Sequence, residues 1–152
     1  MTSVKPIPEG YPPISIYILV RDGEAALAFY KQALGAVEVR LDHNAAGKLN
    51  NIELKVGTSM IMIGMTPNAK VPAPRMDDLP TVSAYLYVED VDAVFERMLA
   101  AGATALNPPT DQIYGDRRAD VVDPFGVLWW VASRVENVSP EEVTRRAQQM
   151  QA

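Results

Sequence analysis

The sequence predicts an α+β fold made of two tandem βαβββ units, and three observations support this prediction. Residues 15–22 (SIYILVRD) return as residues 83–90 (SAYLYVED), with the serine, tyrosine, valine and aspartate identical in both copies. A helical pattern follows each copy and ends at a glycine. Three short segments with the alternation of β-strands then follow each helix. A doubled supersecondary unit predicts two equivalent halves, each opened by the repeated segment as a strand.

The first unit spans about residues 13–65. Its opening strand is expected at 14–20, where the even positions are all aliphatic. Asp22 is expected to be the N-cap of a helix at 24–34, because its carboxylate can accept hydrogen bonds from free amides, and Gly35 to be the left-handed C-cap. Strands are then expected at 37–42, 49–56 and 59–65.

The second unit, at about 81–134, repeats this order. A strand is expected at 82–88, and Asp90 is expected to cap a helix whose apolar residues recur at helical spacing from Val91 onward. Gly102 ends this helix. Strands are expected at 104–106, 117–122 and 128–133, the last two joined by a turn at 123–126.

Two further segments complete the single domain expected over residues 1–152. Residues 66–80 contain four prolines and no periodicity, so they are predicted to link the two units. Ser139, followed by Pro140 and two glutamates, forms a capping box that predicts a C-terminal tail helix at 139–149. The polarity of this helix indicates a surface element that is available to pack on a partner subunit.

Alternation also assigns a face to each strand. The aliphatic even positions need the cover of the one helix in each unit, so the odd positions are expected to line the inner surface of a cupped mixed sheet, with the helices outside. The third strand agrees, because Ile52 and Leu54 share one face while Asn51 and Glu53 share the other. The expected lining comprises Ser15, Tyr17, Asn51, Glu53, Ser83, Tyr85 and Tyr87.

Composition excludes several classes of function. A net charge of −5 and a pI near 4.8 leave no basic surplus, so no nucleic-acid partner is expected. The chain has no cysteines, which excludes disulfides, thiolate metal sites and a cysteine nucleophile. No apolar run approaches the roughly 20 residues of a membrane helix, and the first residues lack a signal-peptide pattern. A cytoplasmic protein without a membrane partner is therefore expected.

Short motifs carry a family resemblance over nearly the whole chain. Together with the tandem βαβββ units, they resemble the vicinal oxygen chelate superfamily of glyoxalase I, extradiol dioxygenases, and fosfomycin and bleomycin resistance proteins, and more narrowly its PhnB-like branch. The resemblance implies the glyoxalase/bleomycin resistance fold and a homodimer. The motifs are VRD at 20–22 with FY at 29–30, VGTSMIMI at 56–63, YVEDVDA at 87–93, YGDR at 114–117, DPFG at 123–126 and VENVSPEE at 135–142.

The same resemblance indicates that the metal centre of many relatives is missing. Where metal-binding members place a histidine, seven residues before the capping aspartate, this chain has Ser15 and Ser83. The glutamate ligand of the last strand falls at Trp130, its first-unit counterpart falls in the apolar run 60–63, and a histidine of the PhnB-like third strand is replaced by Asn51. Serine hydroxyls are poor ligands for zinc, iron or nickel. Neither a metal nor another cofactor is expected.

These observations predict a metal-independent protein of the bleomycin-resistance kind that binds an aromatic or drug-like small molecule, with a role in antibiotic resistance. Two alternatives stay open. In the first, the chain is a glyoxalase-like lyase or isomerase, or a dioxygenase-related enzyme, with a non-standard or metal-free site, and Glu53 is the candidate catalytic base. In the second, the cavity is filled by its own side chains and the protein acts through association. The expected ligand-binding residues are Ser15, Tyr17, Asn51, Glu53, Met62, Ser83, Tyr85, Tyr87, Tyr114 and Trp130.

Overall fold

The computed structural model describes residues 6–65 and 82–150, and its contacts divide the chain into two units, Met1–Pro74 and Arg75–Ala152. The predicted linker at 66–80 lies outside the described residues. The assignment of the linker, and of the whole chain to a single domain, therefore stays a prediction.

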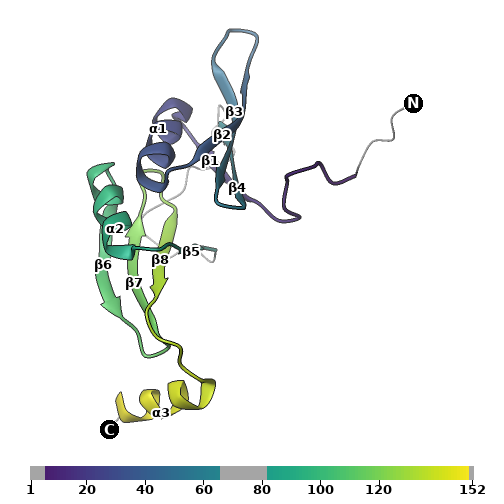
Figure 1. Ribbon diagram of the computed structural model, residues 1–152. Coiled ribbons are helices and arrows are strands. Elements are labelled where there is room, and N and C mark those ends of the chain that lie inside the picture. The colour runs from purple at the N-terminus through teal and green to yellow at the C-terminus, as the bar shows by residue number, and fades with distance from the viewer. Residues whose placement is uncertain (1–5, 66–81, 151–152) are drawn as a thin grey trace. The chain divides into compact units, whose positions relative to one another are not determined.

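Unit 1 is a four-stranded mixed sheet with one helix (Figure 1). The sheet order is β1-β4-β3-β2, with β1 parallel to β4 and the other neighbours antiparallel. The helix packs against β3 and β4, which places it on the aliphatic face of the sheet. The elements are β1 (Ile16–Val20), α1 (Gly23–Leu34), β2 (Val37–His43), β3 (Leu49–Val56) and β4 (Ser59–Met65).

Both ends of α1 are capped as the sequence predicts. The Asp22 carboxylate accepts a hydrogen bond from the Ala25 amide at 3.0 Å, which satisfies one of the free N–H groups of the first turn. Gly35 follows the helix with a φ of 63°, a left-handed conformation that glycine adopts without steric cost. Tyr30 of this helix is fully buried against the sheet, where Ile52 and Leu54 of β3 are also fully buried.

Unit 2 repeats the topology of unit 1. Its sheet order is β5-β8-β7-β6, with β5 parallel to β8, so β5 occupies the position that β1 occupies in unit 1. The two βαβββ units and the α+β class are thereby confirmed. The elements are β5 (Ala84–Tyr87), α2 (Val91–Ala100), β6 (Thr104–Asp111), β7 (Asp116–Val122), β8 (Leu128–Arg134) and α3 (Pro140–Met150).

The boundaries of three strands differ from the prediction by two residues or more, and those of β2, β7 and β8 differ by one residue. The opening strands begin later than expected, at Ile16 and Ala84, and the aliphatic side chains that precede them are exposed and lie outside the cover of the helices. Strand β6 continues beyond the predicted 104–106 to Asp111. Its register with β7 shifts between Asn107 and Thr110, where two prolines lack the amide protons of a regular ladder. Because of this bulge, the second half of β6 lacks the alternation that predicts a strand.

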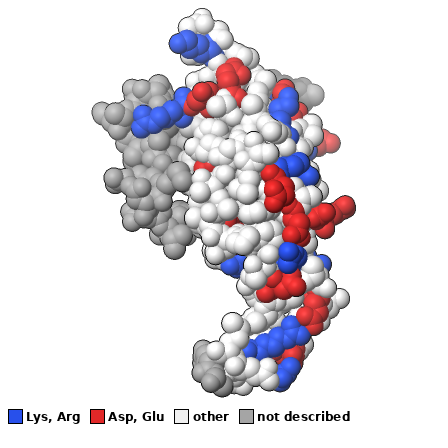
Figure 2. Space-filling view, turned by 90° about the vertical axis from the view of Figure 1, so that its left-hand side faces the viewer, with Lys and Arg blue, Asp and Glu red and all other residues white. Residues whose placement is uncertain are grey.

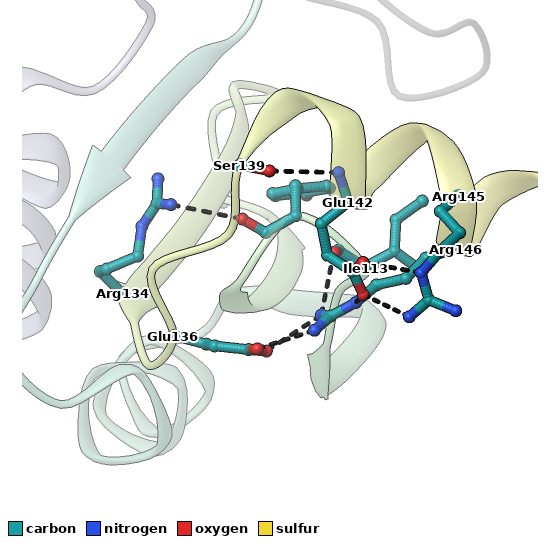
Figure 3. Close-up of polar contacts among 8 residues, drawn as sticks. Ile113, Arg134, Glu136, Ser139, Glu142, Arg145 and Arg146 are labelled. Atoms are coloured by element: carbon teal, nitrogen blue, oxygen red, sulfur yellow. Dashed lines mark hydrogen bonds and ion pairs between the residues drawn. The ribbon is translucent and has the colours of Figure 1, made fainter.

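The predicted tail helix is α3, which begins one residue later than expected. The Ser139 hydroxyl accepts a hydrogen bond from the Glu142 amide at 3.2 Å, in agreement with the predicted cap. Arg146 fastens the helix to the rest of unit 2, because it donates to the Ile113 carbonyl at 3.2 Å and pairs with Glu136 at 2.7 Å (Figure 3). Negative and positive side chains lie next to one another on this helix (Figure 2), where Glu142 pairs with Arg145 at 2.6 Å and with Arg146 at 2.9 Å.

The turn that Arg146 of α3 contacts, which contains Ile113 and Gly115, is closely packed. Gly115 has a φ of 94°, and its carbonyl accepts hydrogen bonds from the amides of Val135 and Glu136, both at 3.0 Å. A Cβ atom at position 115 would collide with the Glu136 carbonyl oxygen, so this position requires glycine for its space as well as for its φ. Within residues 6–65 and 82–150, no helix has the length and apolar character needed to cross a membrane.

Candidate functional site

Strand register in unit 1 places four predicted site residues on one face of the sheet. Tyr17 of β1 and Glu53 of β3 both pair with Met62 of the central strand β4, so these three side chains form one row. Asn51 lies in the next row on the same face, opposite Gly64. The Tyr17 hydroxyl lies over Gly64, where a Cβ atom would collide with it. The face that alternation predicted to be polar is therefore assembled in unit 1.

Glu53 is held by a residue that the sequence did not indicate. Only 6% of Glu53 is exposed, and its carboxylate accepts a hydrogen bond from the hydroxyl of Tyr11, which belongs to the segment before β1. This hydrogen bond to Glu53 raises the pKa of Tyr11, so the phenol stays protonated and remains the donor. Arg40 and Asp42 of β2 complete the cluster with an ion pair of 2.9 Å.

The aromatic residues predicted for the second unit come together on one face of its sheet. Tyr85 pairs in register with Trp130, and Tyr87 follows two residues later on the same strand, so all three point to the same side. The Tyr85 ring centroid lies 5.2 Å from that of Tyr87 and 6.4 Å from that of Trp130. Since 45% of Tyr85 and 55% of Tyr87 is exposed, this aromatic layer is open to solvent.

A buried carboxylate fixes two of these rings. Asp116 of β7 is 1% exposed, and its Oδ2 accepts hydrogen bonds from the hydroxyls of Tyr85 and Tyr87, both at 2.8 Å. Its Oδ1 lies 2.7 Å from Nε of Arg134 in an ion pair. Burial and the hydrogen bond to Asp116 raise the pKa of Tyr85, so this phenol remains a protonated donor.

A second carboxylate organises the other end of the layer. Arg118 donates to Asp120 at 2.8 Å and, through Nη1, to the hydroxyl of Tyr114 at 2.8 Å. The Asn107 amide donates to the other Asp120 oxygen, also at 2.8 Å. The Arg118 guanidinium carbon lies 4.1 Å from the centroid of the Trp130 ring, within the range of a cation–π interaction. The phenol of Tyr114, the indole of Trp130 and the arginine thus form one connected group.

We call the surface formed by Tyr85, Tyr87, Tyr114, Trp130, Arg118 and Arg134 the unit 2 aromatic face. The sequence identified its aromatic members but missed its charged ones. A signal for them exists, because Asp116, Arg118 and Asp120 occupy alternate positions of β7, while Ala119 and Val121, on the opposite face of the strand, are fully buried. Ser15 and Ser83 precede β1 and β5 and belong to neither strand.

The residues present do not fit the metal centre of metal-binding relatives. In the described part of the chain, no three histidine, cysteine, aspartate or glutamate side chains lie close enough together to hold a metal ion. Trp130 stands where a glutamate ligand would be, and an indole N–H is only a hydrogen-bond donor. Glu53 is the one carboxylate in its row and is already bound by Tyr11. His43 lies exposed at the end of β2.

Comparisons with known proteins place this fold and sequence in a family. The model of the Glyoxalase/Bleomycin resistance protein/Dioxygenase superfamily matches residues 14–131. The uncharacterized protein Rv0887c of Mycobacterium tuberculosis is 34% identical over 143 residues, which cover 87% of this chain and 80% of that protein.

Two crystal structures are similar in fold. TioX from Micromonospora sp. ML1 superposes with a TM-score of 0.64 at 23% identity, over 80% of this chain and 98% of that one. The PhnB protein from Bacillus cereus superposes with a TM-score of 0.64 at 17% identity, over 80% of this chain and 99% of that one. These two likenesses show a shared fold. The match of the family model over residues 14–131 establishes that the chain belongs to the Glyoxalase/Bleomycin resistance protein/Dioxygenase superfamily.

Proposed function

We propose that this protein binds a small, planar aromatic molecule on the unit 2 aromatic face, without a metal ion, in the manner expected of a bleomycin-resistance-like protein. The observation that carries the proposal is the open pair of Tyr85 and Tyr87, whose hydroxyls are both fixed by the buried Asp116. Exposed aromatic rings supply a stacking surface. Because their hydroxyls are already anchored, little side-chain freedom is lost when a ligand binds.

An equilibrium binding screen tests the proposal. Folded protein is titrated with a panel of aromatic natural products and drugs, and we expect at least one ligand to bind with saturation. Tyr87→Ala is expected to lower the affinity for this ligand by about 2- to 10-fold, because the substitution removes one stacking ring. Tyr87→Phe, the matched control, keeps the ring and retains most of the affinity. A panel without any binder would count heavily against the proposal.

Metal independence is tested separately. The protein, purified without chelator, is expected to contain no stoichiometric zinc, nickel, iron or manganese by elemental analysis, since neutral serine and indole groups occupy the ligand positions. Addition of EDTA is expected to leave ligand affinity unchanged. The metal-free interpretation would be contradicted if the protein contained one equivalent of any of these metals and if EDTA removed both the metal and the ligand binding.

A second candidate function rests on Glu53. A nearly buried carboxylate that accepts a hydrogen bond from Tyr11 is a possible acid–base pair for a metal-free isomerase or lyase. In this function Glu53 takes a proton from the substrate and a tyrosine stabilises the developing oxyanion. Glu53→Gln keeps the shape of the side chain and removes the base. Turnover that survives this substitution would exclude Glu53 as the base, whereas loss of turnover with retained folding would support the enzyme.

Assembly and location complete the proposal. The protein is expected to act as a cytoplasmic homodimer, and α3 offers a contact because none of its side chains is buried within unit 2. Val143, Ala147 and Met150 lie at helical spacing on one side of α3. Sedimentation velocity of the full chain is expected to give a dimer. A monomer at all concentrations tested would reject this part of the proposal, as well as the alternative of a protein that acts through self-association.

A further inference from the structure

Two buried side-chain atoms of the unit 2 aromatic face make no hydrogen bond within the described residues. Asp116 Oδ1 still lies 2.7 Å from Arg134 in an ion pair, whereas Trp130 Nε1 has no such partner. The indole Nε1 of Trp130 is buried and has no hydrogen-bond partner among the described residues. A buried N–H group without an acceptor is destabilising, and most buried donors in proteins are paired. By contrast, the other tryptophan, Trp129, donates its indole N–H to Asp123 at 2.9 Å.

The charges around Trp130 favour one kind of ligand. Both carboxylates of the face are already occupied: Asp116 accepts from two tyrosines and pairs with Arg134, and Asp120 accepts from Arg118 and Asn107. Each guanidinium group has five N–H donors and no acceptor. Arg134 is 47% exposed, so part of its charge remains accessible. A ligand that approaches this face therefore meets available donors and no available carboxylate.

We propose that the ligand is an aromatic molecule bearing an oxygen acceptor, a carboxylate or a ring-attached carbonyl, and that Trp130 Nε1 is the donor that selects it. This inference rests on the proposed function, since it concerns the ligand of the same face. The aromatic part of the ligand stacks on Tyr85 and Tyr87, while its oxygen accepts the indole N–H close to the positive charge of Arg118. The indole nitrogen is covered in the free protein, so binding includes a small shift of a neighbouring side chain.

Three probes of equal size separate charge from stacking. They are 2-naphthoate, 2-naphthamide and 2-naphthylmethylammonium, each titrated into the full-length protein by calorimetry. We expect the carboxylate to bind at least about 10-fold more tightly than the ammonium, with the amide between them, because a charge-assisted hydrogen bond is stronger than a neutral one. If none of the three binds, the proposed function itself fails. If they bind with equal affinity, or the ammonium binds best, the aromatic site stands and the acceptor inference is overturned.

The two indole N–H signals provide a readout that needs no mutation. In a ¹H–¹⁵N spectrum, 2-naphthoate is expected to move the Trp130 indole signal downfield, while the Trp129 signal stays in place as an internal control. A complex in which the Trp130 signal does not move would overturn the inference.

Substitutions on the two faces of β7 supply a matched comparison. Arg118→Met is expected to lower naphthoate affinity by about 10-fold or more. Arg117→Met removes the same charge from the opposite face of β7, where Arg117 pairs with Asp92 of α2, and this control is expected to leave the affinity unchanged. Equal losses in both variants would show that only net charge matters and would also contradict the inference.

Discussion

Asp116 is the residue on which the geometry of the unit 2 aromatic face depends most. Its carboxylate is nearly inaccessible, accepts two phenolic hydrogen bonds of 2.8 Å and lies 2.7 Å from Arg134. Asp116→Asn preserves the volume and one oxygen but removes the charge. Because asparagine is neutral, both phenols lose their charged acceptor, and an NH2 group that takes the place of Oδ1 cannot accept a hydrogen bond from Arg134.

The magnitude follows from these contacts. A hydrogen bond to a charged group contributes about 1.5–3 kcal/mol, and breaking a fully buried ion pair costs about 3–5 kcal/mol. Arg134 and both tyrosines are about half exposed, so water can hydrate them once the carboxylate is gone. We therefore expect Asp116→Asn to lower the free energy of unfolding by about 2–3 kcal/mol, which is less than the cost of breaking a fully buried ion pair. The substitution is also expected to weaken ligand binding, because Tyr85 and Tyr87 are no longer fixed.

Urea unfolding, followed by tryptophan fluorescence, measures the free energy of unfolding of unit 2, because both tryptophans lie in β8. Asp92→Asn is the matched control, since Asp92 pairs with Arg117 at 2.8 Å on an exposed surface. This control is expected to change the free energy of unfolding much less than Asp116→Asn, because water screens an exposed ion pair. If Asp116→Asn were no more destabilising than Asp92→Asn, with equal m-values, the network around Asp116 would not hold the aromatic face as described.

Two further predictions concern the attachment of α3. Gly115→Ala is expected to destabilise unit 2 in urea unfolding by more than Gly102→Ala. Both glycines lie in unit 2 with a positive φ, which costs an alanine about 1–2 kcal/mol, but only at position 115 does the added Cβ atom collide with the segment that leads into α3. Equal losses would contradict the close packing. Hydrogen bonds from Arg145 and Arg146 lower the pKa of Glu142 to about 2. Because this pKa is depressed on folding, the stabilisation is complete above about pH 4.5 and is lost as the pH falls toward 2. The protection factors of the α3 amides, which correct for the intrinsic pH dependence of exchange, are therefore expected to fall over that range and to stay constant between pH 5 and 7. Protection factors that stay constant down to pH 2 would contradict this prediction.

Much of the fold follows from local patterns in the sequence. The doubled segment identified both opening strands, and the aspartates at 22 and 90 cap their helices with hydrogen bonds of 3.0 Å, as expected from residue type alone. These features depend on neighbouring residues, so a short window of sequence contains them. Strand β6 was predicted too short because its bulge and prolines break the alternation that identifies a strand.

The candidate site was predictable only in part. Alternation assigned Tyr85 and Tyr87 to one face, because side-chain direction within a strand is fixed by position. The family resemblance, and not alternation, selected Trp130. The partners of these residues depend on register between strands distant in sequence, which a single sequence does not specify. Tyr11 illustrates the limit: it comes from a segment without periodicity and reaches Glu53 from 42 residues away along the chain.

A crystal structure of the protein with a bound aromatic carboxylate such as 2-naphthoate tests the central claim most directly. We expect a ring stacked on Tyr85 and Tyr87 at about 3.5–4 Å, an oxygen within about 3.2 Å of Trp130 Nε1, and direct contact between ligand and protein without an intervening metal ion. A ligand seated away from these side chains, or held through a metal ion, would contradict it.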